Sequence, residues 1–495
     1  MNKNRYLLAG IMLLGLALRL LFAEGRSIQY DDAFSIFLAQ QSLANIISGT
    51  AADTMPPLYY FLLHFWLLVS EQLWWLRLLS TLFSLGSILF LYAWVKDLFD
   101  APSALWAALL AAISPFQIYH AQDLRMYALL AFSQMGYAWF FSRLWLGRGT
   151  GGKDGWGNWA GLVGCGTVAM YTHNLAIFVL LVPDLFLVLR REGRLLRNLL
   201  LAQLGMAVLS LPWLLMVPGQ LAKIQTAFWT PRPGLVEILQ AVVVFTTNLP
   251  LPGVWLAVGV VLSFQILVLV ILENWRIRSK RAAQACLTAF ALLPPVLLFA
   301  ASFLMRPVFV PRGFVVSSLA YYGLAGYAIH QRWKGGAGTL LAISFLLAAG
   351  VGLPYQYLYD GFPRSPYQQA VQFIQGRIAV GERVVHDNKL SYFPSRYYAP
   401  DLPQVFLADE AGSPNDTLAL QTQQAMNIFP EPDLAEAIKD QKGIFFVVFT
   451  RTIQEYQQMG YADHPQLAWL ENHSSQWEKW QFNDLDVYYF GHLAP

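Results

Sequence analysis

Long apolar runs recur through the first 357 residues of the chain, and they constrain its fold more than any other feature. A membrane-spanning helix needs roughly 20 apolar residues. The chain is 56% hydrophobic and 13% charged, whereas soluble domains carry about 25% charged residues. The sequence therefore predicts a polytopic α-helical membrane protein with about 11 spans. We expect these spans at 6–23, 75–95, 103–120, 126–146, 158–172, 175–189, 198–217, 253–272, 283–304, 313–330 and 338–357.

The basic residues indicate how the spans are oriented. With the N-terminus inside, Lys and Arg gather in alternate loops such as 190–197 and 276–281, as the positive-inside rule requires. Two further apolar runs, 57–70 and 235–249, are only about 15 residues long, which suits interfacial or re-entrant helices. We therefore expect the chain in the plasma (inner) membrane, with everything after the last span on the extracytoplasmic side.

The composition changes near residue 360, where long apolar runs end and Gln, Asp, Asn and Pro become frequent. "SPYQQAVQFIQGRIA" has helical periodicity, and "ERVVHD", "QVFLA", "GIFFVVFT" and "DVYYFG" are typical of strands. We predict a membrane domain at 1–357 and a soluble α/β domain at 358–495, in which we expect a partly parallel sheet. The second domain has no catalytic motif, so a structural or acceptor-guiding cap is its favoured interpretation.

Two adjacent acids, Asp31 and Asp32, follow the first expected span in "SIQYDDAFSIFLAQQ". One interpretation is a helix cap, with the acids at the positive end of the helix dipole. One acid suffices for a cap, and a second acid beside it costs energy. Adjacent acids also suit a general base. The residues alone leave both interpretations open.

A second acid lies in "HAQDLRMYALL", where the third expected span meets the outer face. An ordinary loop salt bridge would explain Asp123 and Arg125, with little effect on stability. The alternative is that Asp123, Arg125 and Tyr127 contact a substrate on the side that also holds Asp31. Asp32 and Asp123 are then candidate ligands of a divalent metal ion, the one cofactor that we consider.

Several basic residues lie on the outer side, where the positive-inside rule disfavours them. They are Arg19, Arg26, Arg77, Arg125, Lys223, Arg232, Arg306 and Arg312. Some will snorkel to the head groups, but Arg306 and Arg312 flank a span start in "MRPVFVPRGF", and arginine forks suit phosphate oxygens. Acids and arginines together point to a phosphorylated lipid substrate. His173, in the turn "YTHNLA", would have at most a minor role in substrate binding.

The order of motifs resembles a known family. After a basic N-terminus and a first span come "YDDAFS", "DTMPPLYYFLLHFW", "WWLRLLSTLFSLGSILFLY", "AISPFQIYHAQDLRMYALL" and "FVPRGFVVSSLAYYGL". This order is similar to that of the GT-C fold membrane glycosyltransferases, above all glycosyltransferase family 39, which includes protein mannosyltransferases and bacterial aminoarabinose transferases. The resemblance covers about residues 1 to 330 and no part of the C-terminal domain.

The resemblance implies an inverting transfer of a sugar from a polyprenyl-phosphate donor to an acceptor hydroxyl at the outer face. It makes Asp31 the catalytic base, with Asp32 beside it, and it maps the family's second acidic loop onto Asp123. The "PPLYY" element adds Tyr59 to the substrate-binding residues. Aminoarabinose transferases have a Glu-Lys pair before this proline, where this chain has Thr54-Met55. An arginine must then replace the lysine that contacts phosphate.

The main alternatives are a secondary transporter and a lipid-linked sugar flippase. Transporters tend to show paired half-repeats with charges at the membrane midplane. This chain shows no such repeat, and its unusual charges gather at one face. The sequence also lacks HExxH, CxxC and Gly-rich phosphate loops, which disfavours zinc proteases and cytosolic nucleotide enzymes. Expected partners are the lipid-linked donor, membrane lipids and an acceptor of unknown class (protein, lipid or glycan), and nucleic acid is not expected.

Overall fold

The structure is a computed structural model that describes residues 2–147, 153–226, 230, 232–305, 307–359, 361, 364–410, 413 and 415–493. These residues divide into two compact units. The first is Met1–Glu24 with Thr50–Phe362, and the second is Gly25–Gly49 with Pro363–Pro495. The sequence alone draws one boundary at residue 357, which leaves Gly25–Gly49 with the membrane part. The structure instead groups this segment with the C-terminal residues.

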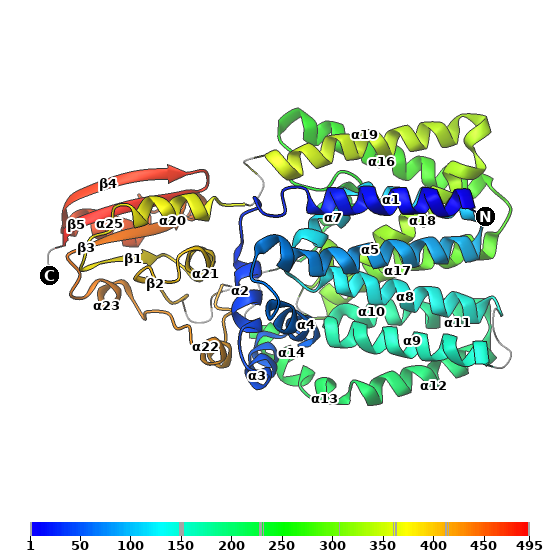
Figure 1. The fold of residues 1–495 in the computed structure, drawn as a ribbon, viewed down its shortest axis with the longest axis horizontal. Helices are drawn as coiled ribbons and strands as arrows, with labels where there is room; N and C mark the ends of the chain where they lie inside the picture. Colours follow the sequence, from blue (N-terminus) through cyan, green and yellow to red (C-terminus); the bar gives the residue numbers. More distant parts are fainter. Residues whose placement is uncertain are drawn as a thin grey trace. The chain divides into compact units, whose positions relative to one another are not determined.

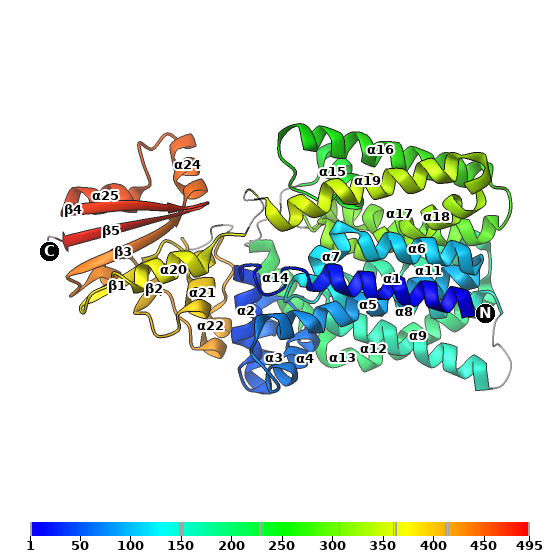
Figure 2. The ribbon, with the colours of Figure 1, turned by 45° about the horizontal axis from the view of Figure 1, so that its top comes forward.

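The first unit is a bundle in which long helices run alongside one another (Figures 1 and 2). Its α-helices are α1 (Asn2–Leu20), α4 (Leu58–Leu67), α5 (Leu73–Leu98), α6 (Ala101–Ile113), α7 (Pro115–Gln122), α8 (Tyr127–Trp145), α9 (Lys153–Thr172), α10 (Ile177–Leu180), α11 (Val182–Arg190), α12 (Gly193–Leu209), α13 (Leu211–Leu214), α14 (Val217–Thr226), α15 (Leu235–Val244), α16 (Gly253–Arg276), α17 (Arg281–Leu304), α18 (Val315–Gln331) and α19 (Ala337–Leu358). Three 3₁₀ turns join them: η1 (Asn174–Ala176), η2 (Pro311–Phe314) and η3 (Trp333–Gly335). The boundary between the units falls within α3 (Leu43–Asp53).

The expected spans are helical, which agrees with the predicted membrane fold. Four of the described helices, α5, α16, α17 and α19, are long and apolar enough to cross a membrane as single helices. Two bent pairs, α6 with α7 (56°) and α12 with Leu211–Leu221 (69°), would raise the number to six. The remaining expected spans are shorter, broken or less apolar. The segment 175–189, for example, is divided among η1, α10 and α11.

The two short apolar runs form helices of ten residues each, α4 and α15. At 1.5 Å per residue, such a helix is about 15 Å long, which is half of the roughly 30 Å hydrocarbon core. Neither helix can therefore cross a bilayer on its own. This agrees with the expectation of interfacial or re-entrant helices.

The second unit is built on a five-stranded sheet with the order β2-β1-β3-β5-β4. Its strands are β1 (Glu382–His386), β2 (Gln404–Phe406), β3 (Gly443–Phe449), β4 (Ser474–Phe482) and β5 (Leu485–Leu493). Its helices are α2 (Tyr30–Ala39), α20 (Tyr367–Gln375), α21 (Lys389–Tyr398), α22 (Leu420–Met426), α23 (Leu434–Ile438), α24 (Thr450–Gln458) and α25 (Pro465–His473). β2, β1 and β3 are parallel, whereas β5 pairs antiparallel with β3 and β4. The predicted α/β domain with a partly parallel sheet is confirmed.

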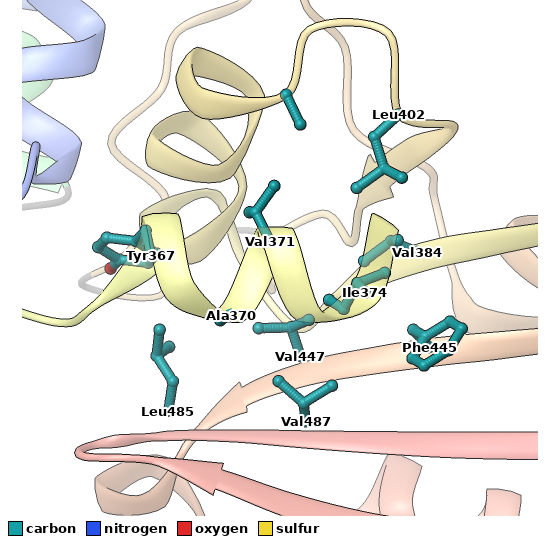
Figure 3. Packing of buried hydrophobic residues seen from close by; sticks show 11 residues of the cluster. Tyr367, Ala370, Val371, Ile374, Val384, Leu402, Phe445, Val447, Leu485 and Val487 are labelled. Carbon is teal, nitrogen blue, oxygen red and sulfur yellow. The ribbon is translucent and has the colours of Figure 1, made fainter. Parts of the chain in front are cut away.

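The central strand β3 is covered on both faces, which explains its continuous apolar sequence. Phe445 and Val447 point to one face, where α20 packs on the sheet (Figure 3). Phe446 and Val448 point to the other face, which contacts α24 and α25. Successive side chains of a strand alternate between faces, so a strand covered on both sides needs apolar residues at every position.

Helices α6 and α18 of the first unit meet at a glycine. A Cβ added at Gly326 of α18 would lie 2.6 Å from the backbone nitrogen of Ala107 and 2.7 Å from the carbonyl oxygen of Ser103, both in α6. Backbone atoms cannot move aside as a flexible side chain can. Only glycine therefore fits at this crossing, as at other small-residue contacts between membrane helices.

We predict that Gly326→Ala destabilises the first unit even though alanine is the better helix former. The clash should cost about 1–3 kcal/mol, more than the roughly 1 kcal/mol that alanine contributes over glycine in a helix. The thermal unfolding midpoint of the purified protein should fall by a few degrees. Gly350→Ala is the matched control, because a Cβ there meets nothing within 4 Å. If both variants unfolded at the same temperature, the close contact would not limit the fold.

Candidate functional site

A bend between α6 and α7 brings the first group of candidate residues together. Ser114 caps α7, its Oγ accepting the N–H of Gln117 at 3.3 Å, and Pro115 occupies the first helical position. Proline fits this position because its missing N–H would have no partner in the helix. Helix α7 ends at Gln122, and Asp123 follows it with extended backbone angles. The short segment that carries Asp123 and Arg125 therefore joins the ends of two helices.

Five side chains from α4, α7, α8 and this segment make three pairwise contacts. Nδ1 of His120 lies 3.5 Å from Oδ2 of Asp123, and both side chains are largely buried. Nη1 of Arg125 donates to the hydroxyl of Tyr60 at 3.2 Å. The ring of Tyr127 lies 5.1 Å from that of His120. The structure thus brings together Asp123, Arg125 and Tyr127, as the sequence predicts, and adds His120 and Tyr60.

Two further candidates, His173 and Arg312, join this cluster. The guanidinium of Arg312 lies 5.6 Å from the ring centre of Tyr127, within the range of a cation–π contact. The ring of His173 lies 5.9 Å from the same tyrosine. Burial is the largest cause that lowers the pKa of His173, and with the positive charges of Arg312 and Arg125 it brings that pKa to about 3. The imidazole is therefore neutral at physiological pH, between two guanidinium groups.

The neutral His173 has a structural role in addition. Its Nδ1 accepts the N–H of Leu175 at 3.1 Å and so caps η1. An Nδ1 that accepts a hydrogen bond leaves the ring proton on Nε2. His173 consequently positions the turn between α9 and η1, whichever substrate the cluster binds. We call Asp123, Arg125, Tyr127, His173 and Arg312 the arginine cluster from here on.

The loop before α4 is held by side chains from other helices. Asn174 donates to the carbonyl of Thr54 at 2.9 Å, and Gln220 donates to the carbonyl of Ala51 at 3.0 Å. Thr54 has φ 77°, in the left-handed region, where only a restraining environment keeps a β-branched residue. Tyr59, a predicted substrate-binding residue whose role in binding stays a prediction, shares a hydrogen bond with Ser80 Oγ at 3.1 Å and is fully buried. Tyr59 therefore joins α4 to α5.

The predicted outer-side basic residues divide into two groups. Arg19 and Arg77 are fully buried and bond to backbone carbonyls: Arg19 to Gly15, Ala111 and Ala112, and Arg77 to Ala23. Their role is to pair groups that apolar surroundings cannot satisfy. Arg125 and Arg312 lie in the arginine cluster. Arg306 and the side chain of Lys223 lie outside the described residues.

The acidic pair lies at the start of α2, in the second unit. Oδ2 of Asp32 accepts the N–H of Gln29 at 3.3 Å, the reciprocal bond of a capping box, and Asp32 is only 3% exposed. Asp31 is half-buried in the first turn. The structure therefore gives Asp32 the capping role that the sequence left open, and the catalytic role of Asp31 stays a prediction.

The expected metal site has no complete ligand set in the part of the chain that the structure describes. There, no three His, Cys, Asp or Glu side chains come together where they could hold an ion. The predicted ligands Asp32 and Asp123 belong to different units, and Asp32 is used as a helix cap. The residues of neither unit fit a bound divalent ion by themselves.

An apolar cavity of about 280 Å³ opens in the first unit between α15, α16, α17 and α18. Its lining is apolar apart from the hydroxyl of Tyr321. The lining residues are Ile238, Ala241, Val242, Phe245, Leu267, Ala291, Leu292, Pro295, Val296, Phe299, Phe309, Phe314 and Tyr321. Phe309 and Phe314 flank Arg312 in the sequence, so one loop contributes to both the cavity and the arginine cluster.

Sequence reasoning missed Tyr60 and His120 as members of the site. His120 stands three residues before Asp123, a spacing that places two side chains on one side of a helix. Tyr60 directly follows the predicted Tyr59. The spacing between His120 and Asp123 could have predicted His120 as a site residue. Which of the adjacent tyrosines faces the site depends on the rotation of α4 about its axis, and no sequence motif predicts that rotation.

Comparisons with known proteins agree with this architecture. A family model described as dolichyl-phosphate-mannose-protein mannosyltransferase matches residues 54–216, which include most of the arginine cluster. ArnT from Cupriavidus metallidurans in the apo state has a similar structure, with a TM-score of 0.63 and 14% identity over 97% of both chains. The same protein bound to undecaprenyl phosphate gives a TM-score of 0.63 at 13% identity. No curated protein sequence matches the chain.

A second kind of enzyme has a related structure. The oligosaccharyltransferase of Archaeoglobus fulgidus in the apo form gives a TM-score of 0.56 and 13% identity over 92% of this chain and 71% of that one. The predicted resemblance to GT-C fold membrane glycosyltransferases is confirmed, and the chain has their fold. A glycosyltransferase, the class of enzyme that the sequence predicts, is also the class that the family model and these structures represent.

We predict that His173 makes the protein less stable in acid. The folded protein binds a proton at His173 only near pH 3, whereas the unfolded chain binds one near pH 6.5. Stability is therefore full above about pH 6.5 and is lost as the pH falls toward 3, by up to about 1.4 kcal/mol per pH unit. His173→Asn keeps a capping oxygen and removes the titration. Its unfolding midpoint should fall less than that of the parent between pH 6.5 and 4.5.

The control is His330→Asn, at a partly exposed histidine of the same unit. Because it leaves His173 in place, this variant should keep the loss of stability in acid that His173 causes. Identical pH dependence for His173→Asn and the parent would contradict a neutral, buried His173.

Proposed function

We propose that this membrane protein transfers a sugar from a polyprenyl-phosphate donor to an acceptor hydroxyl, with inversion at the sugar. The arginine cluster carries the proposal. It holds the guanidinium groups of Arg125 and Arg312 near the neutral His173, and the carboxylate of Asp123 beside His120, within a membrane unit. Buried charge is expensive in such surroundings and marks functional sites by default. An anionic group of the substrate is the chemistry that these charges suit.

The phosphate of the donor is the group that we assign to Arg125 and Arg312. A guanidinium is planar, carries five donors and matches phosphate oxygens in a forked geometry. Arg125 is held by Tyr60 and Arg312 by the ring of Tyr127, so both side chains lose little freedom on binding. These arginines replace the lysine that the resemblance implies and that Met55 does not provide.

The apolar cavity suits the isoprenoid chain of the same donor. Its lining offers apolar side chains almost throughout. A prenyl chain has no polar groups, so such a cavity can hold it with van der Waals contacts in place of those that it makes with lipid tails. The loop with Phe309, Arg312 and Phe314 contributes to both the apolar cavity and the arginine cluster. A donor with an apolar chain and an anionic phosphate needs both kinds of site. The structure of ArnT with undecaprenyl phosphate concerns a protein of this fold and supports the same class of donor.

Asp31 is the residue that we assign as the base. The acceptor hydroxyl attacks the anomeric carbon while the bond from that carbon to the phosphate oxygen breaks. The hydroxyl proton passes to the carboxylate of Asp31, and the polyprenyl phosphate leaves as an anion that the arginines stabilise. Because the anion is a stable leaving group, no second acid is needed. Attack opposite the leaving phosphate inverts the configuration at the sugar.

The reaction is assigned to the extracytoplasmic face of the plasma membrane. The distribution of Lys and Arg among the loops supports this orientation. A membrane surface is where a lipid-borne donor can meet an acceptor from water or from the lipid phase. The acceptor can then be a protein, a lipid or a glycan.

We predict that Asp31→Asn abolishes transfer while donor binding is retained. Asparagine keeps the shape of the side chain and cannot accept the proton, and loss of a general base costs typically 10²–10⁴-fold in rate. The measurement is single-turnover consumption of radiolabelled polyprenyl-phosphate sugars by the purified protein. Asp401→Asn, at an exposed acid of the same unit, is the matched control and should keep full activity.

Asp32→Asn separates the two acids. We expect Asp32→Asn to lower the unfolding midpoint, because Asp32 caps α2, and to affect the transfer rate less than Asp31→Asn does. Substantial transfer by Asp31→Asn would eliminate Asp31 as the base, and failure of every labelled donor with the parent protein would eliminate the proposed reaction.

We also predict that Arg125→Lys and Arg312→Lys weaken donor binding through the phosphate. A lysine keeps the charge and loses the fork, so affinity for polyprenyl phosphate should fall by about 10-fold or more. Affinity for the uncharged polyprenol should not change. The measurement is the difference between the two affinities for each variant in detergent or nanodiscs.

Arg278→Lys, at an exposed arginine of the first unit, is the control for a general effect of the substitution. Equal loss of affinity for polyprenol would indicate a damaged fold. If both variants bound polyprenyl phosphate as the parent does, the phosphate assignment would be wrong.

A further inference from the structure

The second unit contains more than the C-terminal residues, and this grouping has a physical basis. Helix α2, which carries Asp31, packs on α21 through aromatic rings. The ring of Phe393 in α21 lies 5.1 Å from Tyr30, 6.3 Å from Phe34 and 5.8 Å from Phe37. Phe393 is fully buried. One ring of the soluble part therefore contacts three aromatic side chains of α2.

The segment on either side of α2 is tied to the same unit by hydrogen bonds. Before the helix, the N–H of Ile28 donates to the hydroxyl of Tyr398 at 2.9 Å. After it, Thr422 donates to the carbonyl of Gly49 at 3.0 Å. The gap at Gly49 is also narrow, since a Cβ there would lie 2.8 Å from Leu38 and 3.2 Å from Ala425. Both ends of the segment are thus fixed within the unit.

Helix α2 depends on these contacts for its conformation. It has ten residues, and isolated helices shorter than about 12–15 residues are marginal in water. Packing of its apolar face must then supply the stability that its length does not. Tyr30 precedes Asp31 directly, and Phe34 follows it by three residues, so two of the three rings that contact Phe393 lie within one helical turn of the carboxylate.

The position of Phe393 is in turn set by the sheet. Its ring lies 6.2 Å from Phe406 of β2, and the adjacent Tyr392 lies 4.7 Å from the same phenylalanine. The N-terminus of α21 is capped by Asn388, whose side chain accepts the N–H of Leu390 at 2.9 Å. A continuous packed path therefore leads from β2 through α21 to the first turn of α2.

We propose that the C-terminal part of the chain positions Asp31, the proposed base, with Phe393 and Tyr398 as positioning residues. The inference rests on the proposed function, because it takes Asp31 as the base. Neither residue touches the reacting atoms. Phe393 sets the angle of α2, and Tyr398 holds the backbone before it. This gives the soluble domain a defined role in catalysis, beyond that of a cap.

The first test measures the conformation of α2 without any substrate. Hydrogen–deuterium exchange of the amides in Ile28–Ala39 should increase in Phe393→Ala, and mainly at Ile28 in Tyr398→Phe. Exchange in β3 should stay as in the parent, which shows that the sheet is intact. The matched control is Phe373→Ala, which removes a ring that packs on Trp480 and Phe482, at 4.9 and 5.2 Å, away from α2.

The second test separates turnover from donor binding. Phe393→Ala should lower the transfer rate by about 10-fold or more, since displacements near 1 Å can cost up to 10²-fold. Affinity for polyprenyl phosphate, which the first unit binds, should stay within twofold of the parent. Phe393→Leu restores most of the side-chain volume and should recover most of the rate, and Phe373→Ala should transfer as the parent does.

The outcomes distinguish the two proposals. Unchanged exchange in α2, or full transfer by Phe393→Ala, overturns the positioning role even if Asp31→Asn is inactive. An active Asp31→Asn overturns the assignment of the base, whereas increased exchange in Phe393→Ala would still support the contact between α21 and α2. Equal losses in rate and donor affinity would indicate general damage and would also overturn the positioning role.

Discussion

The guanidinium of Arg19 fixes the point at which the membrane unit turns toward its arginine cluster. It is fully buried, and it donates to Ser84 at 2.9 Å and to the carbonyl of Ala111 at 3.2 Å. Pro115 has no N–H for that carbonyl, so the bend between α6 and α7 leaves an acceptor that apolar surroundings cannot satisfy. Such an unpaired group costs about 1–3 kcal/mol. Arg19 satisfies it, and Gln122 ties the end of α7 to the carbonyl of Arg19 itself at 3.0 Å. The placement of Asp123 and Arg125 thus depends on an arginine that acts within the bundle.

An arginine on the outer side can therefore be one of two kinds of residue: one that bonds to backbone carbonyls, and one that lies in the arginine cluster. By the positive-inside rule, Arg19, Arg77, Arg125 and Arg312 all stand out equally. The structure assigns Arg19 and Arg77 to backbone carbonyls near the ends of helices, and Arg125 and Arg312 to the surroundings of His173. Which arginines bond to the backbone depends on which carbonyls lose their hydrogen-bond partner at a break in a helix. Composition does not reveal which carbonyls these are. A proline after a serine, as at 114–115, is a local signal that a carbonyl needs a buried donor.

The parts of the fold that were predictable are those whose pattern is local. The membrane helices follow from apolar length, and β3 follows from a run of apolar residues that only a strand covered on both faces needs. β4 was not predicted, because "SSQWEKWQF" lies at an edge of the sheet and is mostly exposed, so no buried face imposes an alternation. The grouping of α2 with the C-terminal residues was also beyond local reasoning. It rests on contacts such as that between Ile28 and Tyr398, which are 370 positions apart. The order of motifs along the chain instead predicts that α2 belongs with the membrane helices that precede and follow it.

The adjacent acids and the arginine cluster together separate two tasks, the movement of a proton and the stabilisation of charge. In the cluster, arginine does not titrate, and the pKa of His173, at about 3, keeps the imidazole neutral. The positive charge is therefore constant across physiological pH, which suits the contact with a leaving phosphate that we propose. A protonated histidine there would add a charge that varies with pH and would be a second proton donor to the phosphate. Because Asp32 caps α2, Asp31 is the member of the pair that we propose as the base. In the proposed reaction, the proton is taken up by a residue of the second unit and the leaving anion is stabilised by arginines of the first, so each unit contributes one of the two tasks.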